Sequence, residues 1–212
     1  MKITIIYDNT AYREDLKADW GFAALVETLD NTILFDTGTN GTILLSNMEK
    51  LGISPDEVQD IFISHDHFDH TGGLSAFLNE HNNVEIFIPP SFREYTKAIK
   101  TTSIKTPGEI SRGIYSTGEL EGIEQSLCVQ TQEGIVVVVG CSHPDMSEIL
   151  RAASRFGRVY GIIGGMHANK PESLKGPDLI CPTHCTQHIK EMKALYPDQY
   201  IEGGAGQVIE IE

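Results

Sequence analysis

The chain has 212 residues, with 16 lysine and arginine residues against 30 aspartate and glutamate residues, so its net charge at pH 7 is −14. A surface this acidic repels phosphate backbones and anionic lipids, which disfavours a nucleic-acid-processing enzyme or a protein of the membrane surface. The length suits one domain, residues 1–212, with a substantial core. No apolar run approaches the ~20 residues that span a bilayer, and the chain opens with strand-forming residues in place of a signal peptide, so we expect a cytoplasmic protein.

Two kinds of hydrophobic pattern alternate along the chain. Runs rich in β-branched residues, bounded by turn formers, predict strands over residues 2–7, 21–28, 32–35, 60–63, 84–88, 126–131, 135–139, 158–163, 179–181 and 207–211. Apolar residues at helical spacing and cap signals predict helices over 39–51, from Ser54, and over 74–79, 91–100, 146–156 and 187–195. The continuous apolar run 135–139 is typical of a strand buried on both faces. Two successive halves of this kind favour two sheets with helices outside them.

Residues 101–122 show no clear period and are rich in Gly, Ser, Thr and charged side chains. A segment of this kind inside an enzyme is often a lid or a substrate loop. Four of the sixteen basic residues lie in or beside it, namely Lys97, Lys100, Lys105 and Arg112. Two interpretations stay open: the segment receives an anionic group of a substrate, such as a phosphate, or it is a solvated loop.

The most informative stretch is Ser64-His65-Asp66-His67-Phe68-Asp69-His70-Thr71-Gly72-Gly73, which follows a predicted strand. Imidazole and carboxylate groups are common ligands of zinc and of other transition metals. His65 and His67 point the same way if the strand geometry continues, whereas Asp69 and His70 need a turn to point elsewhere. Ligands that leave one loop in two directions predict two neighbouring cations.

Other predicted strands also end in small residues and a ligand-type side chain. These segments are Leu34-Phe35-Asp36-Thr37-Gly38, Gly140-Cys141-Ser142-His143-Pro144, Gly164-Gly165-Met166-His167 and Pro182-Thr183-His184-Cys185-Thr186. Together with His65-x-His67-x-Asp69-His70 and the early Asp8-Asn9 pair, they resemble the metallo-β-lactamase superfamily. The resemblance is to the branch that contains methanopterin-type dihydropteroate synthases and related metal-dependent hydrolases, and it covers essentially the whole chain. It implies an α/β fold, an αββα four-layer sandwich of two mixed β-sheets flanked by helices.

The resemblance also implies the site. It places one metal on three histidines and a second metal on an aspartate and two histidines: His65, His67 and His143 for the first, and Asp69, His70 and His184 for the second. Asp69 would also steer the attacking water. Asp36 would lie buried behind the metal loop and orient a ligand, or it would cap the following helix.

His167 departs from the superfamily pattern, which usually has at this position an aspartate that bridges the two metals. His167 is therefore either an added ligand or a group that handles protons and binds substrate. Without the bridging carboxylate, the cations lie farther apart, share only a hydroxide, or bind unequally.

Nitrogen-rich ligation favours zinc, then iron or manganese, so we expect about two zinc ions per chain. The four cysteines lack a Cys-x-x-Cys pair and are expected to be reduced thiols. The first function hypothesis is a hydrolase in which metal-activated water attacks an ester or phosphoester of a small molecule. The alternatives are a synthase-like transferase acting on a pterin diphosphate and a non-catalytic or sensing metal-binding protein. The sequence contains no signal for the oligomeric state.

Overall fold

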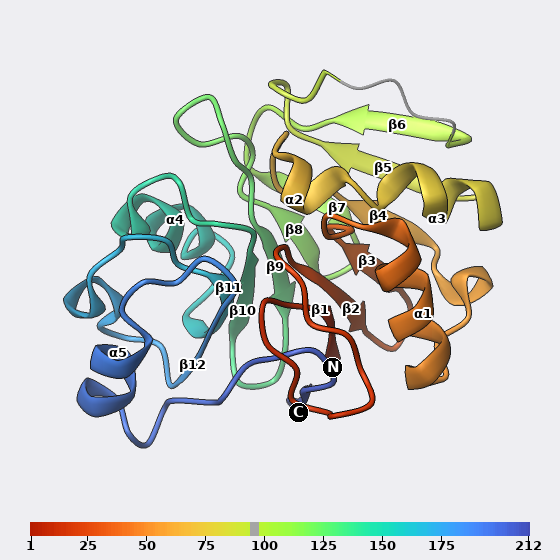
Figure 1. Ribbon diagram of the computed structural model, residues 1–212. Coiled ribbons are helices and arrows are strands. Elements are labelled where there is room, and N and C mark those ends of the chain that lie inside the picture. The colour runs from red at the N-terminus through yellow and green to blue at the C-terminus, as the bar shows by residue number, and fades with distance from the viewer. Residues whose placement is uncertain (94–97) are drawn as a thin grey trace.

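The computed structural model describes residues 1–93 and 98–212. Two mixed β-sheets face each other at its centre, and helices cover their outer sides (Figure 1). The first sheet runs in the order β13 (Val208–Glu210), β1 (Lys2–Tyr7), β2 (Ala23–Glu27), β3 (Thr32–Phe35), β4 (Asp60–Phe62), β5 (Glu85–Ile88) and β6 (Lys100–Ser103). The second runs in the order β12 (Leu179–Thr183), β11 (Val159–Gly165), β10 (Ile135–Val139), β9 (Leu127–Gln130), β8 (Ile114–Ser116) and β7 (Gly108–Ser111). This is the αββα sandwich that the resemblance to the metallo-β-lactamase superfamily implies.

The helices are divided between the two outer faces (Figure 1). The first sheet is covered by α1 (Gly41–Leu51), α2 (Phe68–Thr71) and α3 (Leu74–Glu80), and the second by α4 (Met146–Ala153) and α5 (Ile189–Leu195). Short 3-10 helices are η1 (Pro55–Glu57) and η2 (Pro171–Leu174). The expected stop of the first helix at Gly52 is confirmed, because Gly52 has a left-handed φ of 73°. The capping box at Ser54 is also confirmed, although it starts only η1.

Three apolar cores separate the four layers. Between the sheets, Phe35 of β3 packs in one cluster with Val136 and Val138 of β10. The alternate residues of the same strand, Val137 and Val139, belong to the cluster under α4 and α5. The predicted burial of this strand on both faces is therefore confirmed. A third cluster joins the first sheet to α1 and α3.

The described residues between 91 and 122 differ from the sequence prediction. Where a helix was expected over 91–100, residues 90–91 form a turn and Lys100 begins strand β6; residues 94–97, Lys97 among them, lie outside the described part of the chain. The expected loop 101–122 contains β6, β7 and β8. Strands β6 and β7 lie at sheet edges; β6 is mostly exposed and β7 is mostly half-buried, so neither has the fully buried alternate residues on which strand prediction depends.

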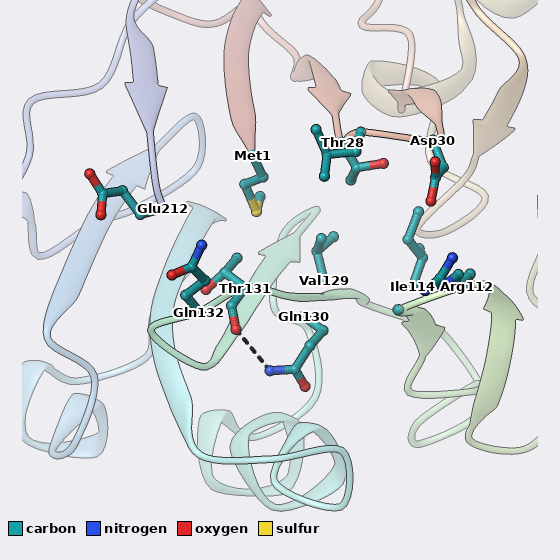
Figure 2. Close-up of a pocket in the computed structure, with 12 residues that line it drawn as sticks. Met1, Thr28, Asp30, Arg112, Ile114, Val129, Gln130, Thr131, Gln132 and Glu212 are labelled. Atoms are coloured by element: carbon teal, nitrogen blue, oxygen red, sulfur yellow. Dashed lines mark hydrogen bonds between the residues drawn. The ribbon is translucent and has the colours of Figure 1, made fainter.

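Two of the basic side chains named for this segment, Lys100 and Arg112, have surroundings that contain none of the predicted metal ligands. Lys100 Nζ lies 2.9 Å from Glu85 Oε1. Arg112 lines a pocket of about 760 Å³ beside Met1 and Glu212, the two ends of the chain, and none of the predicted ligands lines it (Figure 2). Over the described ranges, no helix has the length and apolar character to cross a bilayer.

Candidate metal centre

The predicted ligands follow the carboxyl ends of strands from both sheets. They are His65 and His67 after β4, Asp69 and His70 in α2, His143 after β10, His167 after β11 and His184 in the turn after β12. Strands β10, β11 and β12 are parallel, so their carboxyl ends meet at one edge of the second sheet. The chain thereby brings together residues that are more than a hundred positions apart.

One group consists of His65, His67 and His143, as predicted for the first metal. His67 Nδ1 lies 3.0 Å from His65 Nε2 and 3.2 Å from His143 Nε2. Each ring nitrogen of a neutral imidazole has either one N–H or one lone pair. His67 Nδ1 can therefore form a good hydrogen bond with only one of the two Nε2 atoms, and the other Nε2 is left without a partner in this group. Converging lone pairs of this kind are a suitable setting for a cation.

A second group contains Asp69, His70 and His184, as predicted for the other metal, and also Cys141. The ligand atoms of the four side chains all lie within 4.8 Å of one another. The two groups are neighbours, because the ring centroids of His65 and His70 are 4.2 Å apart. The arrangement therefore has the two adjacent positions that the loop sequence predicts.

Hydrogen bonds fix which ring nitrogen points into the site. Asp36 accepts from His70 Nδ1 at 2.7 Å and from Ser64 Oγ at 2.7 Å. A carboxylate only accepts, so the Nδ1 of His70 carries the proton and its Nε2 is free for a metal. Ser64 Oγ in turn accepts from His65 Nδ1 at 2.8 Å, which frees His65 Nε2. Asp36 is fully buried behind the metal loop, where it orients a ligand as expected. The alternative prediction, that Asp36 caps the following helix, is wrong, because Asn40 caps α1.

The early Asp8-Asn9 pair holds His184 from the far end of the chain. Asp8 accepts the backbone N–H of His184 at 2.7 Å. Asn9 Oδ1 accepts from His184 Nδ1 at 2.9 Å, and Asn9 Nδ2 donates to the His184 carbonyl at 2.8 Å. His184 Nε2 therefore points into the second group. This buried nitrogen has no hydrogen-bond partner among the described residues. It lies 3.2 Å from Asp69 Oδ2.

We expect that replacing Asn9 with alanine lowers zinc affinity at the second site by about 10–100-fold, because the partner that orients His184 is lost. Zinc titration against a chelating dye measures this affinity. The exposed Asn83 provides the matched control, and Asn83→Ala should bind zinc like the parent protein. Equal affinity of the Asn9 variant and the parent would contradict this role.

Glu124 holds the loop that carries His143. Its side chain is buried, and its two oxygens accept four backbone N–H groups at 2.9–3.1 Å. The donors are the consecutive residues Gly140, Cys141, Ser142 and His143. One buried carboxylate therefore fixes the backbone of residues from both ligand groups.

Several residues of the site have left-handed backbone conformations that are unusual outside glycine. The φ angles are 52° for Asp36, 56° for Ser142, 42° for His167 and 47° for His184. Residues of this kind persist only where the surrounding structure determines them, and they cluster at functional sites. The backbone strain is therefore found at residues of the predicted metal-site motifs.

The pKa shifts of three of the histidines and of Asp69 favour the forms that bind a metal. Burial and the neighbouring His67 and His167 lower the pKa of His143 to about 4. Burial also lowers the pKa of His65 and of His184. For Asp69, the cost of burial is outweighed by the nearby histidine rings, which hold the pKa of that carboxyl well below its usual range. These shifts favour the neutral form of His65, His143 and His184 and the charged form of Asp69, as metal ligands require. At His70, the Asp36 carboxylate outweighs the effect of burial and raises the pKa of the imidazole, so a metal ion would have to displace a proton there.

His167 lies beside the first group and belongs to neither group of ligand atoms. Its ring centroid is 5.2 Å from that of His143. Both rings line a pocket of about 340 Å³, together with Glu121, Asp145 and Asn169. This position favours the proton-handling or substrate-binding role over the role of an added ligand.

Cys141 as a ligand, Glu124 and the role of Asn9 are not predicted from the sequence. Cys141 stands in a quoted motif, but it was interpreted only as a reduced thiol; all four cysteines are indeed free. Its position two residues before His143 is the signal that could have suggested a ligand. Glu124 lies between the segment 101–122 and the predicted strand 126–131, and no local signal identifies it.

The fold and the paired ligand groups define a class, the metal-binding αββα sandwich proteins. The chain belongs to the metallo-beta-lactamase superfamily, whose family model matches residues 21–154. Members of this superfamily are generally metal-dependent enzymes.

Individual relatives place the chain more closely. It is 28% identical to the 7,8-dihydropterin-6-methyl-4-(beta-D-ribofuranosyl)-aminobenzene-5'-phosphate synthase of Methanocaldococcus jannaschii, over 86% of each chain. It is 27% identical to an uncharacterized protein of the same organism, over 99% of this chain and 100% of that one. A solved metal-dependent hydrolase of the beta-lactamase superfamily superposes with a TM-score of 0.81 at 24% identity, over 100% of this chain and 99% of that one, which shows the shared fold.

Proposed function

We propose that the protein is a metal-dependent hydrolase that binds two zinc ions and cleaves an ester or phosphoester of a small molecule. The observation that best supports this proposal is the pair of adjacent ligand groups, in which unpaired ring nitrogens converge. The proposed ligands are His65, His67 and His143 for one ion and Asp69, His70 and His184 for the other. Imidazole-rich donor sets suit zinc; iron or manganese is the alternative.

The donor set fits such ions, because the buried His184 Nε2 has no hydrogen-bond partner among the described residues and lies 3.2 Å from the Asp69 carboxylate, another metal-ligand atom. Zinc, when bound, lowers the pKa of its water to about 7 and polarises the bond under attack. Asp69 would bind the second ion and steer the attacking water. Trp20 orients it, because the indole N–H of Trp20 donates to Asp69 Oδ2 at 2.8 Å. His167, half-buried in the pocket beside His143, is placed to bind substrate or to carry a proton to the leaving group.

The pocket beside the first group limits the substrate. Its volume of about 340 Å³ suits a small molecule or one end of a larger molecule. Trp20 is 57% exposed, and its ring centroid lies 5.0 Å from that of His184, so it forms part of the rim of the site. The acidic overall charge agrees with a small-molecule substrate better than with nucleic acid.

Two measurements test the proposal. Elemental mass spectrometry on protein purified without added metal or chelator should find about two zinc ions per chain. The zinc-loaded protein should hydrolyse at least one member of a panel of aryl phosphate, bis-phosphate, carboxylic ester and thioester substrates. Metal binding without any turnover would instead favour a non-catalytic, sensing protein, and absence of bound metal would contradict both.

A transferase acting on a pterin diphosphate is the second candidate function. It is favoured by the 28% identity, over 86% of each chain, to a synthase named for a dihydropterin product. Both reactions require a nucleophile to attack a centre that a metal activates, so the ligand groups serve either. A raised melting temperature in the presence of a pterin diphosphate would support the transferase, and no shift with it or with its analogues would exclude this function.

A further inference from the structure

The second ligand group contains a thiol that the proposed function does not use. We propose that the Cys141 sulfur, as a thiolate, is a fourth protein ligand of the second metal ion. This inference rests on the proposed metal site and extends it. The second ion would then be held by Asp69, His70, Cys141 and His184.

The position of Cys141 supports this role. Its Sγ lies 3.1 Å from His70 Nε2, the nitrogen that Asp36 leaves free for a metal. The residue is only 3% exposed, and its backbone N–H donates to the buried Glu124 at 3.0 Å. The thiol is thus held inside the group, where it faces the unpaired His184 Nε2 and the Asp69 carboxylate.

The end of β11 supplies no second carboxylate to the two ligand groups. A Cβ at Gly164 would lie 2.0 Å from the Val139 carbonyl oxygen, and one at Gly165 would lie 2.4 Å from the Gly140 carbonyl oxygen. No carboxylate side chain fits at either position. The next residue, Met166, is fully buried in the core under α4 and α5, and His167 turns into the pocket. Asp69 is therefore the single carboxylate in the two groups of ligand atoms found among the described residues.

A Cys141 thiolate adds the second negative charge. When the ion binds, the S–H bond breaks, the sulfur keeps the electron pair and forms the bond to the metal, and the proton is released to solvent. Thiolate favours zinc over magnesium, calcium or manganese. Four protein ligands close the second site, whereas the three histidines of the first group leave a position for water. The open position then lies beside the pocket that His143 and His167 line.

Cobalt substitution tests the assignment without any substrate. Cobalt(II)-loaded parent protein should show an intense near-ultraviolet thiolate-to-cobalt charge-transfer band, and Cys141→Ser should lose this band. Cys185 is the matched control, because its thiol lies beside Cys141 and donates to the Cys141 carbonyl at 3.7 Å, but it is outside the ligand group. Cys185→Ser should keep the band.

Three outcomes would overturn the assignment: a parent protein that binds cobalt without the band, a Cys141 variant that keeps the band, or a Cys185 variant that loses it. Failure to bind cobalt at all would instead contradict the proposed metal site, so the two failures are distinguishable. X-ray absorption of the zinc-loaded parent protein gives a second test that does not depend on a variant that folds. It should detect one sulfur at about 2.3 Å from zinc, and its absence would refute the inference.

Discussion

Replacing His65 with alanine is expected to empty the first metal site and to reduce hydrolysis to background. His65 Nε2 lies 3.0 Å from His67 Nδ1 in the first group, so its loss leaves two histidines where three converge. Metal content should fall from about two ions to about one per chain. Without the metal, water returns to a pKa of about 15.7 from about 7, and almost no hydroxide is present at neutral pH.

Elemental analysis and the hydrolysis panel measure the two parts of this prediction. The control is His188→Ala, since His188 belongs to neither ligand group and its side chain is 35% exposed. Circular dichroism should show that both variants keep the fold. Full retention of metal or of activity in the His65 variant would refute the assignment of the first site.

Replacing Glu124 with alanine is expected to lower the free energy of unfolding by at least about 4 kcal/mol. Four backbone N–H groups lose their acceptor, and each buried donor left without a partner costs about 1–3 kcal/mol. The loop that carries Cys141 and His143 should then lose its fixed geometry. We therefore also expect zinc affinity to fall by about 10–100-fold.

Urea denaturation of the metal-free protein and zinc titration measure these two effects. Glu124→Gln keeps the shape and one acceptor oxygen, so its losses should be smaller than those of the alanine variant, and it provides a test if the alanine variant does not fold. The exposed Glu133, in the turn between β9 and β10, is the matched control. Stability of Glu124→Ala within about 0.5 kcal/mol of the parent, the range of ordinary surface substitutions, would contradict the role of the carboxylate.

Local patterns were sufficient where the physical cause is itself local. His65, His67, Asp69 and His70 lie within six residues, so their types and spacing alone indicate a metal loop. The continuous apolar run 135–139 likewise predicts burial on both faces, and the two apolar clusters on either side of β10 confirm it. Edge strands β6 and β7 were missed because neither has a fully buried face, and without one there is no clear hydrophobic alternation to detect.

Contacts between distant segments decided the rest. Cys141 meets His70 across 71 positions, and Asn9 orients His184 across 175. No spacing in the chain encodes such pairs, because the distance between two side chains then depends on strand order and register. The sequence by itself determined the kinds of ligand and their placement at strand ends, since these follow from side-chain chemistry and local periodicity. Only the tertiary structure decided which atoms share a site and which nitrogen is free in His65, His70 and His184. It also decided that the Cys141 thiol lies beside Asp69, since packing of the two sheets brings these strand ends together.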